Sequence, residues 1–281
     1  MLFLITSLLY FAGMNSISTQ KRNVLAVANI VVFLFVIVMN YLAVTLPLNN
    51  KTTGELSDEY PNMFTPAGIT FSIWSVIYLF ITGFVIYQAN VLFKNKVSST
   101  VIARISPFFI INCLANGSWL FAWHYQQVAL SVAIMLVMLV TLIFIHHTLK
   151  LALPFQPLNQ KLWLDVPFSL YLGWISIATI ANITTLFVAN DILPLGISST
   201  AWTLIMIIIG AVLSLFMVLA KKNIIFGVVV CWAFLGIIIK RIDVASLGSR
   251  EIILVCQVCI GLILAAIYIA ATKVSKRAPL I

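Results

Sequence analysis

Long apolar stretches, separated by short polar or proline-bearing breaks, repeat along the whole chain. Eight of them can be read, at 24–46, 67–93, 105–123, 128–146, 163–189, 196–220, 223–239 and 252–272. A helix needs about 20 predominantly apolar residues to cross a bilayer, and most of these stretches are that long. The pattern therefore predicts an all-α, polytopic membrane protein with about eight transmembrane helices.

Composition agrees with this fold class. Of the 281 residues, 63% are hydrophobic and only 8% are charged, whereas a soluble domain is about 25% charged. A chain of this kind packs helix against helix and turns its outer faces to lipid. Membrane lipid is therefore the first expected partner, and a soluble domain is excluded.

The basic residues have two readings. A net charge of +9 is compatible with a nucleic-acid partner, but no basic stripe interleaved with aromatic residues exists. With the N-terminus inside and sides alternating, the inside breaks hold twelve of the sixteen lysines and arginines, and the outside holds Lys51, Lys240, Arg241 and Arg250. Such a bias sets the orientation of membrane helices. We expect no nucleic-acid partner, both termini in the cytoplasm, and a plasma-membrane or inner-membrane location.

The first residues are set apart from the helices that follow. Residues 1–13 are apolar but too short to span a bilayer. A polar stretch begins at Met14 and ends with Lys21 and Arg22, just before the first long apolar stretch. We expect residues 1–23 to form an N-terminal extension, with the native start at Met14.

Few residues are suited to catalysis or metal binding. The three histidines fall at the edges of the apolar stretches, and the four cysteines lie inside them, where small apolar packing is their usual role. No familiar catalytic, nucleotide-binding or zinc motif is present. Asp165 is the one acid near the apolar part of a stretch and lies close to Lys161. It is read as a solvated ion pair or as a proton-coupling group. We predict no metal site and no catalytic residue, so an enzyme is disfavoured but left open.

Aromatic and amide side chains share helix faces in two stretches. Asn116 and Trp119 are three residues apart and Trp123 extends the same face. In the fifth stretch, Tyr171, Trp174, Ala178 and Asn182 again lie on one face. Asparagine in hydrocarbon needs a partner, so both faces should point into the bundle. They describe a pocket for a flat, apolar ligand or, alternatively, adhesive contacts between helices.

The same residues resemble those of the TspO/MBR family, the tryptophan-rich sensory proteins related to the peripheral benzodiazepine receptor. A proline at 66 is followed by Trp74 eight residues later and by Tyr78 four beyond it. Asn-x-x-Trp recurs at 116–119, and Tyr-x-x-Trp-x-x-x-Ala-Thr-x-x-Asn recurs at 171–182. The chain departs from the family at Gly68, where a tryptophan is usual, and at Pro167, which is displaced. Spans six to eight have no counterpart in the five-helix members.

The resemblance implies a five-helix bundle over 24–190, with an added three-helix unit and short cytoplasmic tail over 191–281. It implies an aromatic-lined pocket for a porphyrin, another tetrapyrrole or a sterol-like molecule, and a possible homodimer. No cofactor would be required, although a porphyrin or haem-like ligand could be bound. The expected ligand-binding residues are Trp74, Tyr78, Asn116, Trp119, Trp123, Tyr171, Trp174 and Asn182.

These features favour a membrane receptor or sensor that binds a planar hydrophobic ligand. A small-molecule transporter is the first alternative, although no internal repeat is evident. A tryptophan-assisted porphyrin-degrading activity, carried by Trp74 and Trp174, is implied for some relatives and is the second. A structural protein whose aromatic faces only pack is the third. The pocket should open toward the outer side beneath loop 47–65, which is either a lid or a solvated connector.

Overall fold

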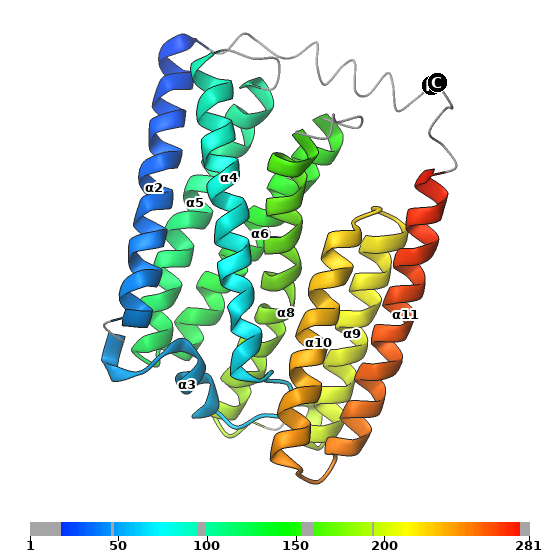
Figure 1. Ribbon diagram of the computed structural model, residues 1–281. Coiled ribbons are helices and arrows are strands. Elements are labelled where there is room, and N and C mark those ends of the chain that lie inside the picture. Colours follow the sequence, from blue (N-terminus) through cyan, green and yellow to red (C-terminus); the bar gives the residue numbers. More distant parts are fainter. Residues whose placement is uncertain (1–17, 46–47, 95–98, 153–159, 193, 276–281) are drawn as a thin grey trace.

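The computed structural model describes residues 18–45, 48–94, 99–152, 160–192 and 194–275, and this part of the chain is helical without strands. Eight of its helices are long and apolar enough to cross a membrane. They are α2 (Thr19–Thr45), α4 (Ile73–Phe93), α5 (Ser99–His124), α6 (Val128–Ala152), α8 (Val166–Ala189), α9 (Ser199–Leu219), α10 (Ile224–Val244) and α11 (Ser249–Ser275). The predicted all-α, eight-span architecture is confirmed (Figure 1). The proposed start at Met14 lies outside the described residues.

Local signals set several helix boundaries. A π-helical turn at Lys161–Asp165 leads into α8, where Pro167 occupies the first turn and removes no needed hydrogen bond. The side chain of Asn223 caps α10 by accepting from the backbone N–H of Phe226 at 3.1 Å. This helix ends at Ala245, whose φ of 33° is left-handed.

Several predicted spans begin or end elsewhere, and two of these differences affect the site. The third was predicted to start at residue 105, but α5 starts at Ser99 and carries Pro107 within it. The seventh was predicted to end at 239, but α10 continues to Val244. Hydropathy falls at Lys240, yet the helix persists because Lys240 pairs with Asp58 at 2.8 Å and Arg241 is buried. Lys240 and Arg241 are therefore residues of the last helical turns rather than of a loop.

The helices form two groups that lie side by side in Figure 1: α2, α4, α5, α6 and α8 on one side, and α9, α10 and α11 on the other. α10 faces α8 across a close contact, since a Cβ added to Gly173 would lie 3.1 Å from that of Val229. One continuous hydrophobic core includes residues of both groups. Independent folding of 24–190 and 191–281 stays a prediction.

Buried polar side chains join the first helices. Asn29 of α2 donates to Gln88 of α4 at 3.1 Å and to Ser106 of α5 at 2.8 Å. Asn112 of α5 donates to the backbone oxygen of Met138 and to the hydroxyl of Thr141 on α6. Where lipid supplies no hydrogen bonds, such amides fix which helix faces meet.

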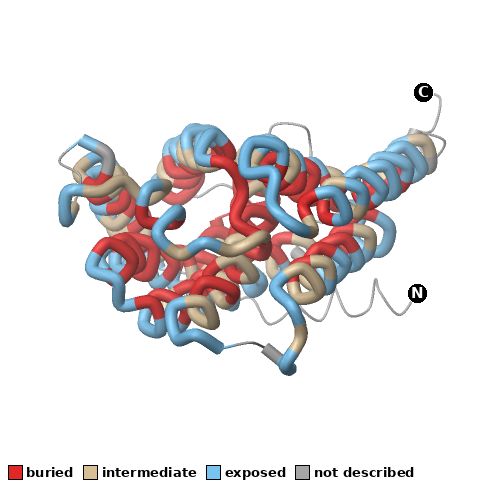
Figure 2. The backbone as a smooth tube through the Cα atoms, turned by 90° about the horizontal axis from the view of Figure 1, so that it is seen from below, coloured by how far each residue is buried: buried red, intermediate tan, exposed pale blue. Residues whose placement is uncertain are grey.

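Residues 48–67, here called the cap, are folded across one end of the bundle, here called the cap end. The cap contains a short 3-10 turn (Leu48–Asn50) and α3 (Thr53–Asp58), and leads into a second 3-10 turn (Gly68–Ser72) before α4. Leu56 and Phe64 are fully buried. Figure 2 views the molecule from the cap end. Residues 64–67 of the cap are buried. A solvated connector would not bury these side chains.

Candidate functional site

The predicted site residues gather in the half of the bundle nearest the cap, on α4, α5 and α8. Trp74 is the centre of the cluster. Its ring centroid lies 5.4 Å from that of Tyr78, 5.7 Å from that of Tyr171 and 6.3 Å from that of Trp174. Trp119 stacks on Trp123 at 5.6 Å. The three motif patches therefore meet in space.

Asn116 has its hydrogen bonds within the protein. Its amide nitrogen donates to the hydroxyl of Tyr171 at 2.6 Å, and its oxygen accepts from Tyr78 and from Asn40 at 3.3 Å each. Four helices thus meet at one amide. This arrangement matches the alternative reading of the motif residues as contacts between helices.

Asn182 is engaged in the same way. Its oxygen accepts from the indole N–H of Trp119 at 3.1 Å, and its nitrogen donates to Ser131 of α6 at 2.9 Å. The indole N–H of Trp123 donates to the backbone oxygen of Thr53 in the cap at 3.2 Å. Both indoles are held by protein acceptors and are not free for a ligand.

Trp174 differs from these two tryptophans. It is 3% exposed, and its indole nitrogen has no hydrogen-bond partner in the described chain. It faces a small cavity of about 50 Å³, here called the aromatic cavity, which is lined by Thr53, Ser57, Thr65, Pro66, Phe71, Trp74, Trp119, Trp123, Met135, Trp174, Ile177, Ala178, Ala181, Asn182 and Thr185. A buried N–H without a partner costs about 1–3 kcal/mol. A residue that lines the cavity therefore carries a hydrogen-bond donor without an acceptor in the described chain.

A second space lies on the other side of Trp74. It is a groove of about 700 Å³, here called the lateral groove, between α2, the cap, α4 and α5. Its lining includes Tyr78 and Asn116, and also Asn40 and Tyr41 of α2. Phe71, Trp74 and Trp119 line both spaces and form the wall between them.

The expected single cavity is thus divided. Trp123, Trp174 and Asn182 line the aromatic cavity, Tyr78 and Asn116 line the groove, and Tyr171 is among the lining residues of neither. Pockets that hold drug-sized ligands have volumes of roughly 300–1,000 Å³. The groove meets that size, whereas the aromatic cavity holds a planar macrocycle only if the wall moves.

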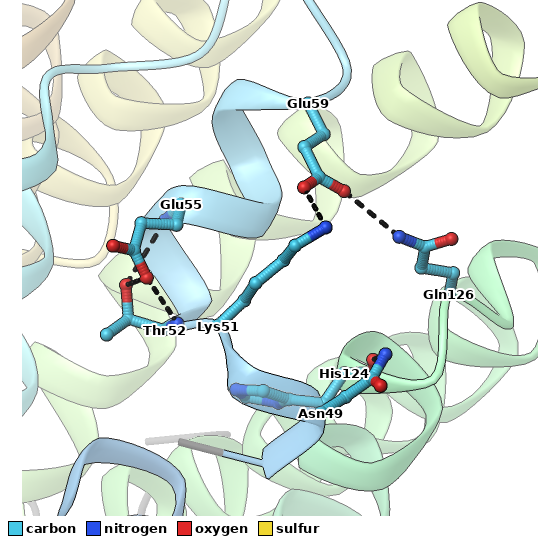
Figure 3. Close-up of polar contacts among 7 residues, drawn as sticks. All are labelled: Asn49, Lys51, Thr52, Glu55, Glu59, His124 and Gln126. Carbon is cyan, nitrogen blue, oxygen red and sulfur yellow. Dashed lines mark hydrogen bonds and ion pairs between the residues drawn. The ribbon is translucent and has the colours of Figure 1, made fainter.

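The cap is tied to the turn between α5 and α6 by polar contacts (Figure 3). Asn49 donates to the backbone oxygen of His124 at 2.9 Å, and Gln126 donates to Glu59 at 3.0 Å. Glu59 also pairs with Lys51. Glu55 completes a capping box at the start of α3. Both ends of α3 are therefore fastened over the two spaces.

Electrostatics of the cap follow from these contacts. Hydrogen bonds from the backbone N–H and the hydroxyl of Thr52 lower the pKa of the Glu55 carboxyl below its usual value. Burial raises the pKa of Tyr60, whose ring centroid lies 6.2 Å from that of Trp123. Glu55 is therefore ionised, and Tyr60 neutral, at neutral pH.

Sequence reasoning missed several residues of the two spaces. Asn40 and Tyr41 lie in the first apolar stretch, where an asparagine inside a span was a usable signal. Thr65 and Phe71 lie near Pro66 in the sequence and line the aromatic cavity. Arg241 was assigned to a loop. Nothing local to these positions indicated that the cap and α10 would cover the site.

Asp165 pairs with a different lysine from the one expected. Its carboxylate lies 3.0 Å from the ammonium of Lys150 on α6 and accepts from Ser169. Asp165 is 6% exposed and pairs with Lys150, so the prediction of a solvated ion pair with Lys161 is wrong. Among the residues that the structure describes, no group of three potential ligands for a metal ion occurs, and the four cysteines are buried free thiols.

The fold and the site together define a polytopic helical membrane protein with an aromatic cavity and a lateral groove beneath a folded cap. The sequence model of a family described as TSPO-like protein matches residues 26–269, and the chain belongs to that family. The match extends beyond the first five spans through α9 and α10 and most of α11, so the family model covers the last three helices as well. No curated protein and no solved structure matches the chain.

Proposed function

We propose that this protein is a membrane receptor or sensor that binds a planar, largely apolar ligand between the aromatic cavity and the lateral groove. The single observation that carries the proposal is Trp174, a residue that lines a cavity and whose buried indole N–H lacks an acceptor in the described chain. A flat ligand with an acceptor at its edge, such as a tetrapyrrole with a carboxylate or carbonyl substituent, would supply that hydrogen bond.

The wall between the two spaces supports this class of ligand. Phe71 and Trp74 present their rings edge-on to Trp174, with centroids 5.9 and 6.3 Å away. Aromatic contacts of this kind stabilise by about 0.5–1.5 kcal/mol beyond area burial. Trp74 is only half-buried, because its other face borders the groove. Rotation of Trp74 would join the two spaces and let a flat ring system stack between them.

Access from the bilayer is part of the proposal. The groove lies between α2 and α4, and Tyr41 on its rim is 65% exposed on the outer face of the bundle. An apolar ligand dissolved in lipid would reach the groove sideways, while the cap blocks the aqueous route. Both termini would lie in the cytoplasm, as the charge bias predicts, and a homodimer stays a prediction.

Titration of the purified protein with a porphyrin panel tests this function. We expect a saturable shift of the porphyrin absorption band and quenching of tryptophan fluorescence. Trp174→Phe should weaken binding because it removes the free donor. Trp202→Phe is the matched control, since Trp202 on α9 donates to Thr184 at 3.2 Å and lines neither space. Absence of saturable binding by the intact protein would leave the aromatic faces as packing only.

The same sample separates the alternatives. Loss of the porphyrin band under illumination, dependent on Trp74 and Trp174, would indicate the degrading activity instead of simple binding. Movement of porphyrin across proteoliposome membranes would indicate transport. Binding with neither of these outcomes is what the receptor or sensor predicts.

A further inference from the structure

A third space lies between the cap and the added helices, and we call it the basic pocket. It has a volume of about 410 Å³, and its lining includes Asp58, Thr65, Ser199, Lys240, Arg241 and Ser246. It joins a loop early in the chain to the last turns of α10. No motif residue of the family resemblance lines it.

Arg241 carries a positive charge that the described chain does not balance. The residue is 4% exposed, its Nε has no hydrogen-bond partner in the described part of the chain, and it belongs to none of the ion pairs Lys51–Glu59, Lys150–Asp165 and Lys240–Asp58. Lys240 beside it is already paired with Asp58 at 2.8 Å. Burial of an unpaired charge is strongly unfavourable, so a guanidinium at such a position calls for an anion.

Thr65 supplies a second unsatisfied group. It is 4% exposed, and its hydroxyl has no partner among the described residues. The side chain of Asn62 fixes this part of the cap by accepting from the backbone N–H groups of Phe64 and Thr65 at 3.1 and 2.8 Å. A rigid hydroxyl donor therefore lines the same pocket as the unpaired guanidinium.

We propose that the basic pocket binds an oxyanion, a carboxylate or a phosphate, through the guanidinium of Arg241 and the hydroxyl of Thr65. Arginine suits this task because its planar fork matches the geometry of both groups. After the pair between Lys240 and Asp58, the charged groups of the pocket leave one net positive charge, which matches one anionic group.

The position of the pocket indicates where the anion comes from. Thr65 and Ser57 line the basic pocket and also the aromatic cavity, so the two spaces adjoin. A ligand with an apolar ring system and an acidic side arm would occupy both at once. This extension rests on the proposed function, whereas the oxyanion site itself does not.

The first experiment uses inorganic phosphate alone. The melting temperature of the intact protein in neutral detergent is measured with phosphate and with chloride at equal ionic strength. We expect phosphate to raise it for the wild type, less for Thr65→Val, and not for Arg241→Gln. Arg250→Gln is the matched control, because Arg250 is exposed at the same end of the bundle. Arg241→Lys keeps the positive charge. If Arg241→Gln fails to fold, the response of Arg241→Lys to phosphate is measured in its place.

The second experiment identifies the source of the anion. A dicarboxylic porphyrin and its dimethyl ester are compared for binding to the wild type and to Arg241→Gln. We expect the wild type to bind the acid roughly tenfold more tightly than the ester, because the acid gains one charge-assisted hydrogen bond. Arg241→Gln should bind the acid and the ester equally. If neither porphyrin binds, the proposed function fails while the phosphate result still decides the site.

A third arm compares nanodiscs of neutral lipid with nanodiscs that contain an anionic phospholipid. Stabilisation of the wild type over Arg241→Gln only by anionic lipid would assign the oxyanion to a headgroup. The proposal is overturned if phosphate, the acidic porphyrin and anionic lipid all fail to distinguish the wild type from Arg241→Gln.

Discussion

The indole of Trp74 stands edge-on to the indole of Trp174, with ring centroids 6.3 Å apart and planes at 83°. One ring comes from α4 and the other from α8, so this contact closes the wall between the lateral groove and the aromatic cavity. Trp174 is buried with a free N–H, whereas Trp74 has one face toward the groove. Under the proposed function, this packing contact would open and the two rings would become walls of the binding site.

Trp74 should contribute to ligand binding by stacking. Loss of one aromatic pair costs about 0.5–1.5 kcal/mol, which weakens binding about 2–13-fold. Trp74→Ala should reach or exceed the upper value because contact area is also lost, and Trp74→Phe should lie near the lower one. Porphyrin titration in matched detergent measures both. Equal losses for Trp202→Phe would remove the special role of Trp74.

Gly236 of α10 should not tolerate a side chain. A Cβ there would lie 2.0 Å from the hydroxyl oxygen of Thr70 and 2.9 Å from the Cβ of Pro66. We expect Gly236→Ala to destabilise the protein by about 1–3 kcal/mol, as overpacking does. The contact also holds the chain next to the aromatic cavity, since the N–H of Ala67 donates to the backbone oxygen of Gly236 at 2.9 Å.

Gly261 of α11 is the matched control for this substitution. A Cβ there meets nothing within 4 Å, and alanine is favoured over glycine inside a helix by about 1 kcal/mol. Gly261→Ala should therefore leave stability unchanged or raised. Unfolding in detergent, followed by tryptophan fluorescence, compares the two variants, and an equal loss for both would refute the close-contact explanation.

The cap should loosen in acid. The pKa of Glu55 is lowered in the folded state by its hydrogen bonds with Thr52. Its contribution to stability is therefore present above the unfolded value of 4.5 and is lost as pH falls through the lower folded pKa. The protection of residues 52–56 against hydrogen exchange, relative to the intrinsic rate at each pH, should fall in that range. Glu55→Gln should remove this pH dependence, and unchanged acid behaviour in the variant would point to another group.

Asn182 should matter for stability as well as for the site. Asn182→Ala removes the acceptor of the Trp119 indole N–H and the donor to the Ser131 hydroxyl, which keeps its own bond to the backbone oxygen of Val128. Hydrogen bonds between membrane helices average about 0.6 kcal/mol, so a loss of roughly 1–2 kcal/mol is expected for two. Asn190→Ala is the control, because exposed Asn190 bonds only to Leu186 of its own helix. Similar losses for both would contradict the interhelical role.

The orientation of the chain can be tested directly. The bias of lysine and arginine predicts both termini on the cytoplasmic side and the cap on the other. Reporter fusions at residues 50 and 281 should therefore report opposite sides of the membrane. Seven predicted spans separate the two positions, so the same side for both would mean that this number of spans is wrong.

The sequence by itself determined the helices and their inward faces. The length of each apolar stretch, its composition and the three-to-four-residue spacing within it are local properties of the chain. The eight spans followed from the first two, and the shared faces of Asn116 with Trp119 and of Trp174 with Asn182 followed from the spacing. The same locality made the asparagines recognisable as interior residues, because an amide cannot remain unpaired in hydrocarbon.

Only the tertiary structure decided how those faces are used. Pairing between segments far apart in the chain set the partners: Trp232 donates to the backbone oxygen of Thr70 at 3.0 Å, across 162 positions of sequence. Such contacts fold the cap against α10, bury Arg241 and divide one expected cavity into two spaces. Spacing along a helix cannot reveal them, since their energy depends on which distant surfaces meet.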